Sequence, residues 1–177
     1  MIQPWWERIG GPGLAQGDLL PDCIVPIMPP DYEPPLLDDE GDYTFGGAVF
    51  DLIIITQSCD LENDKAPLVA TCPIFTIADY ERENEAFKRK GRWEQVRKGQ
   101  IEGLYLLASP DEPDDNRKAQ VADFHQIYSL PVGYLINHTA RLGSRWRLRS
   151  PYLEHYSQAF ARFFMRVGLP SDLPPFR

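Results

Sequence analysis

The feature that most constrains the fold is a continuous apolar run at residues 48–57, which reads Ala-Val-Phe-Asp-Leu-Ile-Ile-Ile-Thr-Gln. A β-branched run without polar alternation is typical of a strand buried on both faces. We therefore expect this run to form the central strand of a sheet. Residues 68–77 follow a polar turn and are expected to form its antiparallel neighbour, with Pro73 at a bulge or at the end of the ladder.

Further strands are expected before and after this pair. Residues 18–28 are rich in apolar side chains, but Pro21 and Pro26 lack a backbone N–H. This strand is therefore expected at an edge of the sheet or with a bulge. Later strands are expected at residues 104–107, 119–127 and 145–149.

Two helices are predicted from the residues at their ends. Residues 79–90 carry acidic side chains first and basic side chains last and are followed by Gly91, an order that complements the helix dipole. They are expected to form a surface helical insertion of about residues 79–98. Ser150 and Pro151 are expected to start a C-terminal amphipathic helix of about residues 151–167. Residues 130–139 are left open between a helix and a loop.

The chain of 177 residues is expected to form a single domain. The expected class is α+β, a small antiparallel β-barrel with the helical insertion and the C-terminal helix. The Gly-Gly-Pro-Gly stretch at 10–13 disfavours both helix and strand, so residues 1–16 are expected to form a flexible segment before the domain at 17–177. The acidic, proline-rich loop at 29–42 is either functional or disordered.

Composition disfavours several classes of protein. The net charge of −8 argues against a DNA-coating role, because the phosphate backbone favours a basic surface. The longest apolar stretches fall far short of a bilayer span, so no membrane role is expected. The three cysteines have unrelated spacings and fit reduced thiols, which favours the cytoplasm. No phosphate-binding loop, dinucleotide motif or metal-ligand spacing is present, so neither a cofactor nor a metal is expected.

The polar residues 56–60 end the aliphatic run and are expected at the rim of the sheet. Cys59 is a candidate nucleophile, with His125 as its base and Asp60 or Asp123 orienting the imidazole. The alternative is a buried structural cysteine beside a turn-capping Asp60. Gln57 and Ser58 are candidate binding residues at the same rim.

A second candidate surface is basic. Arg145, Trp146 and Arg147 alternate on an expected strand, which sends the guanidinium groups to one face and the indole to the core. Together with the basic residues between Lys88 and Lys98, the two arginines are candidate contacts for single-stranded RNA. The alternative is a solvated basic face.

Several short motifs occur in an order that resembles the MazF and PemK toxin family. They are Gly17-Asp18-Leu19, the strand from Val49 to Thr56, Cys72-Pro73, and the stretch from Val121 to Ile127. The resemblance implies an SH3-like barrel over about residues 17–128, and it implies that Thr76 approximates a polar site residue of the family. Where that family carries its catalytic arginine, this chain has Phe50-Asp51, so a binding module is expected rather than a ribonuclease.

The ranked expectation is a non-enzymatic binding or regulatory module of a bacterial or phage-type system, of the defence or toxin–antitoxin kind, acting through a protein partner. The first alternative is a MazF-like RNA-binding or RNA-cleaving protein. The second is a cysteine-dependent hydrolase centred on Cys59. The wide apolar face of the C-terminal helix also leaves room for a homodimer.

Overall fold

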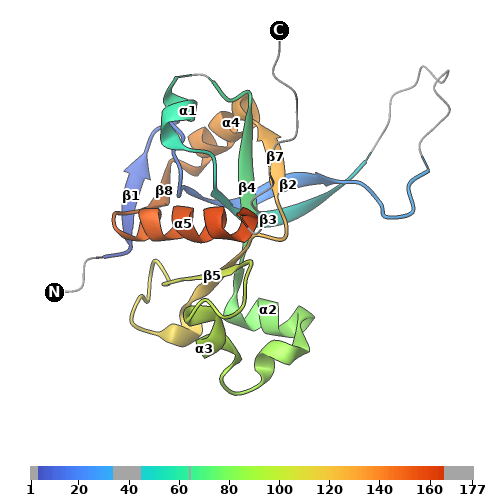
Figure 1. Ribbon diagram of the computed structural model, residues 1–177. Coiled ribbons are helices and arrows are strands. Elements are labelled where there is room, and N and C mark those ends of the chain that lie inside the picture. The colour runs from blue at the N-terminus through green and yellow to red at the C-terminus, as the bar shows by residue number, and fades with distance from the viewer. Residues whose placement is uncertain (1–3, 34–44, 64, 166–177) are drawn as a thin grey trace, which may run out of the picture.

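The chain folds into a mixed α+β structure of antiparallel strands and helices, which confirms the predicted class (Figure 1). The computed structural model describes residues 4–33, 45–63 and 65–165. The strands are β1 (Trp6–Gly10), β2 (Leu19–Ile27), β3 (Gly46–Ile54), β4 (Leu68–Thr76), β5 (Leu104–Leu107), β6 (Gln120–Asp123), β7 (Tyr128–Pro131) and β8 (Ser144–Leu148). The helices are α1 (Ser58–Glu62), α2 (Ile77–Glu83), α3 (Arg92–Arg97), α4 (Val132–Leu142) and α5 (Tyr152–Phe164), with the 3₁₀ helices η1 (Glu85–Lys88) and η2 (Asn116–Lys118).

Two antiparallel sheets carry the fold. The larger has six strands in the order β2-β3-β4-β6-β5, with β7 also paired to β4, and the smaller is the pair β1-β8. An isolated bridge between Asp18 and Arg147 links the two sheets. In the part of the chain that the structure describes, no ladder joins β5 to β2, so each of them is an edge strand.

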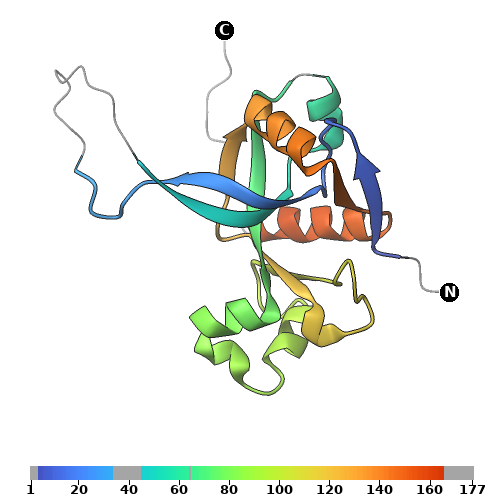
Figure 2. The same cartoon turned by 180° about the vertical axis from the view of Figure 1, so that it is seen from behind.

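The central strand is β4, not the aliphatic run predicted for that position. β4 pairs with β3, β6 and β7, whereas β3 pairs only with β2 and β4 among the strands that the structure describes. The second half of β3 is buried, but its first half forms with β2 a two-stranded arm that extends away from the body (Figure 2). Val49 is therefore 62% exposed and its cross-strand partner Ile24 is 59% exposed. An aliphatic run thus predicts a strand, but it does not predict whether other elements cover the two faces of that strand.

The two proline predictions had different outcomes. β2 is an edge strand whose register shifts between Leu20 and Cys23, with Asp22 at a positive φ of 55°, so the predicted bulge is confirmed. Pro73 lies within the continuous β3–β4 ladder opposite Leu52, so the prediction is wrong on that side of the strand. On the other side the ladder to β7 ends at Thr71 and the ladder to β6 begins at Ile74, so Pro73 does lie where one ladder has ended.

Residues 4–16 are part of the fold, contrary to the flexible segment expected for residues 1–16, of which residues 1–3 lie outside the described residues. β1 pairs with β8 along its whole length. Trp6 is buried, and its indole N–H donates to the Ala108 carbonyl at 2.8 Å. The sequence argument failed because the partner strand lies more than 130 residues away and is invisible to local glycine and proline signals.

The helical insertion is present but broken. The single helix expected at 79–90 ends at Glu83, η1 follows, and Gly91 at a φ of +86° begins α3 instead of terminating a longer helix. These elements enclose a small aromatic cluster of Tyr80, Phe87 and Trp93. The undecided stretch at 130–139 contains the end of β7 and most of α4.

The C-terminal helix α5 covers the sheet, as its apolar pattern predicted. Tyr156 is fully buried and its ring contacts Tyr105 and Phe124, with Phe160 and Phe163 packed around the same cluster. The residue that caps the start of α5 is Pro151, and Ser150 makes no side-chain cap. The predicted end of this helix at residue 167 and the loop residues 34–42 lie outside the described residues.

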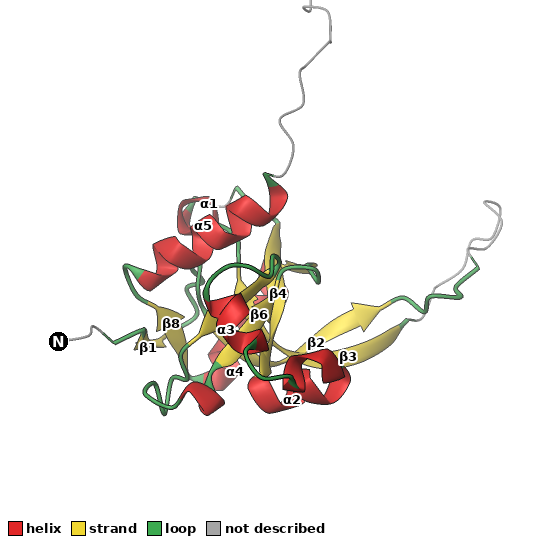
Figure 3. Cartoon of the chain, turned by 60° about the horizontal axis from the view of Figure 1, so that its bottom comes forward, coloured by secondary structure: helices red, strands yellow, loops and turns green. Residues whose placement is uncertain are grey.

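The insertion and α5 lie on opposite sides of the strands (Figure 3). This arrangement leaves the edge strand β5 between two helical layers. None of the helices within residues 4–33, 45–63 and 65–165 has the length and apolar character needed to cross a membrane.

Candidate functional site

A hollow surface lies along the edge strand β5, between the α3 side and α5. A cavity of about 580 Å³ is open here, and its floor includes Leu104, Tyr105 and Leu106. One wall comes from the end of α3 and the loop that follows it, and the other from α5. The wall residues with polar side chains are Arg97, Lys98, Glu102, His155, Gln158 and Arg162.

A second cavity of about 320 Å³ continues along the same strand, because its floor includes Leu106, Leu107 and Ala108. Trp5, Arg97 and Leu106 line both cavities. We call the two together the β5 groove. Its length along the strand suits an extended ligand better than a compact one.

Charged groups stand on both walls of the first cavity. Beside the α3 wall, Glu94 lines the second cavity, accepts bonds from Arg97 at 2.6 and 2.7 Å and lies 3.4 Å from the Lys98 Nζ. The hydrogen bond from Arg97 is the main cause that lowers the pKa of Glu94 to about 2. On the α5 wall, Arg162 is exposed and has no ion pair among the salt bridges of the described residues. The lining of this cavity holds three cations and one carboxylate, Glu102.

An aspartate–histidine pair stands at the edge of the groove. The Asp123 carboxylate is buried and lies 2.7 Å from His125 Nδ1, and it also accepts the His125 backbone N–H at 3.0 Å. The His125 ring meets Phe163 of α5 edge to face at 5.0 Å between centroids. The imidazole is thus held in one orientation with 54% of its side chain exposed.

Gly103 makes room for this histidine. Its φ is +82°, and a Cβ at this position would lie 2.1 Å from a ring carbon of His125. Asp123 orients the His125 imidazole, as predicted for one of the two candidate aspartates. The ring, however, faces Gly103 and Phe163 and not a cysteine.

Cys59 and His125 have different surroundings, so the predicted catalytic group is not assembled. Cys59 is exposed on α1, where its thiol donates to Gln57 at 3.6 Å and to Asp60 at 3.9 Å and has no other hydrogen-bond partner among the described residues. The alternative of a buried structural cysteine is also wrong for Cys59. Residues 57–60 line neither cavity of the β5 groove.

Ser58 of this rim and Thr76 at the end of β4 both make contacts that hold the fold together. Ser58 Oγ accepts the backbone N–H of Gln16 at 3.1 Å. Thr76 caps α2, because its hydroxyl accepts the Asp79 N–H at 3.1 Å and donates to the Asp79 carboxylate at 2.7 Å. The bond from Thr76 is the main reason that the pKa of Asp79 lies below its ordinary value.

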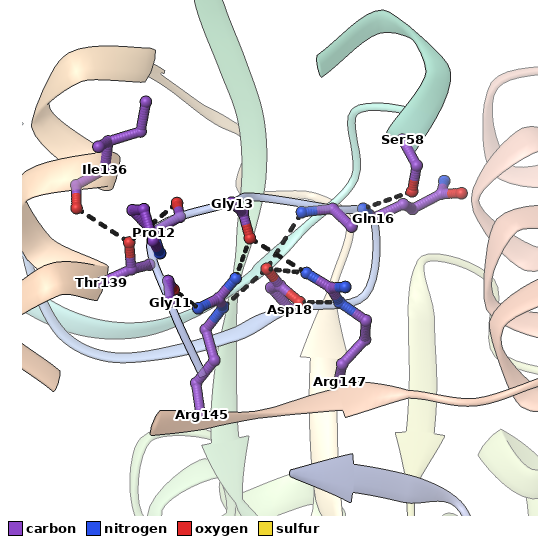
Figure 4. Close-up of polar contacts among 11 residues, drawn as sticks. Gly11, Pro12, Gly13, Gln16, Asp18, Ser58, Ile136, Thr139, Arg145 and Arg147 are labelled. Atoms are coloured by element: carbon purple, nitrogen blue, oxygen red, sulfur yellow. Dashed lines mark hydrogen bonds and ion pairs between the residues drawn. The ribbon is translucent and has the colours of Figure 1, made fainter. Parts of the chain in front are cut away.

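The arginines of β8 share one face of the strand, as the alternation predicts, but that face is covered by the fold and not solvated. Arg145 is 3% exposed, and its Nε donates to Asp18 at 2.8 Å (Figure 4). Arg147 donates to the same carboxylate, and Arg145 also bonds the carbonyls of Gly11 and Gly13. Trp146 is half-buried, packs against the main core as predicted and lies under Arg8 at 4.8 Å. Both guanidinium groups are therefore occupied within the fold and are not presented to a ligand.

The β5 groove was not identified from the sequence, although a signal for one wall existed. His155, Gln158 and Arg162 recur at helical spacing on the polar side of α5. That spacing places them on one face but does not say what lies opposite. In the described residues, no three histidine, cysteine, aspartate or glutamate side chains gather as a metal site.

Native alkylation should distinguish the three thiols. Burial raises the pKa of Cys23 and of Cys72 to about 12, so at neutral to mildly alkaline pH both remain protonated and inaccessible. We expect iodoacetamide to modify only Cys59 in the folded protein, and all three cysteines in urea, as read by peptide mass spectrometry. Modification of Cys72 at the rate of Cys59 without denaturant would contradict the buried position of Cys72.

Comparisons of the chain with protein-family models, with curated proteins and with solved structures found no match.

Proposed function

We propose that this chain is a non-enzymatic binding module that acts through a protein partner, and that the β5 groove is its recognition surface. The observation that carries the proposal is a continuous hollow along an edge strand, with charged walls on both sides and aromatic residues at its floor and end. Binding sites in proteins are concave, mostly apolar and supplied with a few polar groups that fix orientation. The groove has these properties.

A binding role fits the positions of the reactive residues better than either alternative. A cysteine hydrolase needs a base within hydrogen-bond reach of the thiol, and the contacts of Cys59 include no histidine. RNA binding through Arg145 and Arg147 needs free guanidinium groups, but both donate to Asp18.

The proposal also covers the type of fold, the biological system, the compartment and a homodimer. An SH3-like barrel is supported by the antiparallel order β2-β3-β4-β6-β5 and by the Asp18–Arg147 bridge to the second sheet. The resemblance to MazF and PemK proteins supports a regulatory role in bacterial defence or toxin–antitoxin control. Buried free thiols at Cys23 and Cys72 support a cytoplasmic setting. A homodimer through α5 would use its exposed end, where Phe164 and Met165 lie.

Selection from a library of random phage-displayed peptides tests the groove directly. We expect peptides enriched on the wild-type protein to bind Arg162→Glu about tenfold more weakly, because the substitution reverses a charge on the α5 wall. Lys90→Glu is the matched control, since Lys90 is an exposed cation outside both cavities. Fluorescence anisotropy of the labelled peptides measures the affinities.

The outcomes separate the proposal from its alternatives. Equal affinity for the wild-type protein and Arg162→Glu would remove the groove as the recognition surface. No enrichment of any peptide, together with salt-dependent binding of a labelled single-stranded RNA, would replace the protein partner by RNA.

A further inference from the structure

The backbone of β5 has one side committed to the sheet and one side turned to the groove. β5 pairs with β6 in antiparallel register, Tyr105 opposite Ala122 and Leu107 opposite Gln120. The Phe124 N–H donates to the Gly103 carbonyl at 2.7 Å, which identifies that pair as a hydrogen-bonded one. Such pairs recur at every second residue of an antiparallel ladder. Tyr105 and Leu107 therefore bond to β6, and Leu104 and Leu106 direct their N–H and C=O groups outward.

Ala108, the next alternate residue after Leu106, also directs its carbonyl away from β6, and this carbonyl already has a partner. The Ala108 carbonyl accepts the Trp6 indole N–H at 2.8 Å. No described strand pairs with the outer side of β5, whose residues instead form the floor of the β5 groove. Edge strands with unpaired backbone groups are templates for the addition of another strand.

From this geometry, and resting on the proposed function, we infer that an extended acidic peptide segment of a protein partner binds by strand addition to the outer edge of β5. A peptide supplies alternating N–H donors and C=O acceptors that match Leu104 and Leu106. The phosphate groups of a nucleic acid only accept hydrogen bonds, so they cannot bond to the outward carbonyls of β5. The alternating donors and acceptors along the β5 edge therefore favour a peptide over a nucleic acid.

The charges of the walls specify the side chains of this peptide. Alternate residues of an added strand point to opposite faces, one set toward the α3 wall and the other toward α5. Lys98 stands on the first wall and Arg162 on the second. Glu94 offsets part of the charge on the α3 wall, so the strongest preference for an acidic residue is expected beside Arg162. Strand addition supplies the backbone affinity, and these cations select acidic sequences.

Amide hydrogen exchange, followed by NMR on the full chain with an enriched peptide, tests this parity. On binding, the amide exchange of Leu104 and Leu106 should slow by at least about tenfold. The amides of Tyr105 and Leu107 are already bonded to β6, so their exchange rates should change little. Peptide binding with no slowing at residues 104 and 106 overturns strand addition and leaves the groove proposal in place. Failure to obtain any binding peptide counts against the proposed function itself.

A substitution pair gives a second readout. Leu106→Pro removes an N–H that points away from β6, so the ladder to β6 is retained while one bond to the peptide is lost. We expect about a tenfold loss of affinity relative to Leu106→Ala, which shortens the same half-buried side chain and keeps the N–H. Equal affinities of two folded variants would overturn the inference. If Leu106→Pro fails to fold, the exchange experiment on the wild-type protein decides alone.

Discussion

Replacing Asp18 by alanine is expected to lower the free energy of unfolding by about 3–5 kcal/mol, because it leaves a buried guanidinium without its counter-charge. Asp18 is fully buried and accepts bonds from Arg145 at 2.8 Å, from Arg147 at 2.9 Å and from the Ala15 backbone N–H at 3.1 Å. Arg145 would retain only the carbonyls of Gly11 and Gly13. The same carboxylate joins the N-terminal loop, β2 and β8, so its loss loosens three segments together (Figure 4).

Urea titration followed by tryptophan fluorescence measures this effect. Asp114→Ala is the matched control, because Asp114 is exposed and a surface substitution of this kind changes stability by about 0.5 kcal/mol or less. In an Arg145→Met background, Asp18→Ala should cost less than in the wild type, since the unpaired buried charge is gone. A loss below about 1 kcal/mol in the wild-type background would show that water or local rearrangement compensates Arg145.

Several strands of this fold were predictable because local patterns determine them, whereas β1 and β7 were not. Residues 48–57, 68–77 and 104–107 carry enough β-branched and aliphatic character to mark strands, and all three stretches contain one. Their positions in the sheet were not predictable. The aliphatic run became part of an arm because no helix covers its first half, and this depends on where α4 and α5 pack.

The direction of the β8 side chains shows a second limit. Alternation predicts two faces, and hydrophobicity then assigns Trp146 to the core and the arginines to solvent. Trp146 does pack against the core, but the arginine face is covered as well, because Asp18, a buried carboxylate 127 residues from Arg145, lies against it. A buried counter-ion can therefore hold a charged face inside the fold, and no window of neighbouring residues contains that information.

The candidate groove required three segments that are distant in sequence. Trp5 comes from a stretch expected to be detached, Arg97 from the insertion and Arg162 from the last helix. From the sequence, Trp5 was interpreted as a residue of a detached terminus, Arg97 as a solvated cation and Arg162 as part of the polar face of a helix. Only the packing of α3 and α5 on opposite sides of β5 turns them into one surface (Figure 3). The Cys59 hypothesis failed for the same reason. The sequence contains a cysteine, a histidine and an aspartate of suitable types, but it does not show whether their side chains meet.

Alkaline pH is expected to destabilise this protein progressively, because its two buried thiols ionise more readily in the unfolded chain than in the folded one. Burial is the main cause that raises the pKa of Cys23 and of Cys72 from an ordinary 9.0 to about 12. Above pH 9.0 the unfolded state therefore binds fewer protons than the folded state, and stability falls as pH rises. The stability is fully present below pH 9.0 and is lost progressively toward pH 12.

The two thiols together should remove on the order of 3 kcal/mol between about pH 9 and pH 10.5, from the linkage of proton binding to unfolding. Tyr156 adds to the loss, since burial also raises its pKa well above the ordinary value. Urea midpoints across this range measure the slope, which should decrease by up to ~1.4 kcal/mol per pH unit in Cys72→Ala and stay unchanged in Cys59→Ala. The exposed cysteine is the matched control because it reaches solvent in both states. If both variants show the wild-type slope, ionisation of Cys72 does not drive alkaline unfolding, and the tyrosines must account for whatever pH dependence is observed.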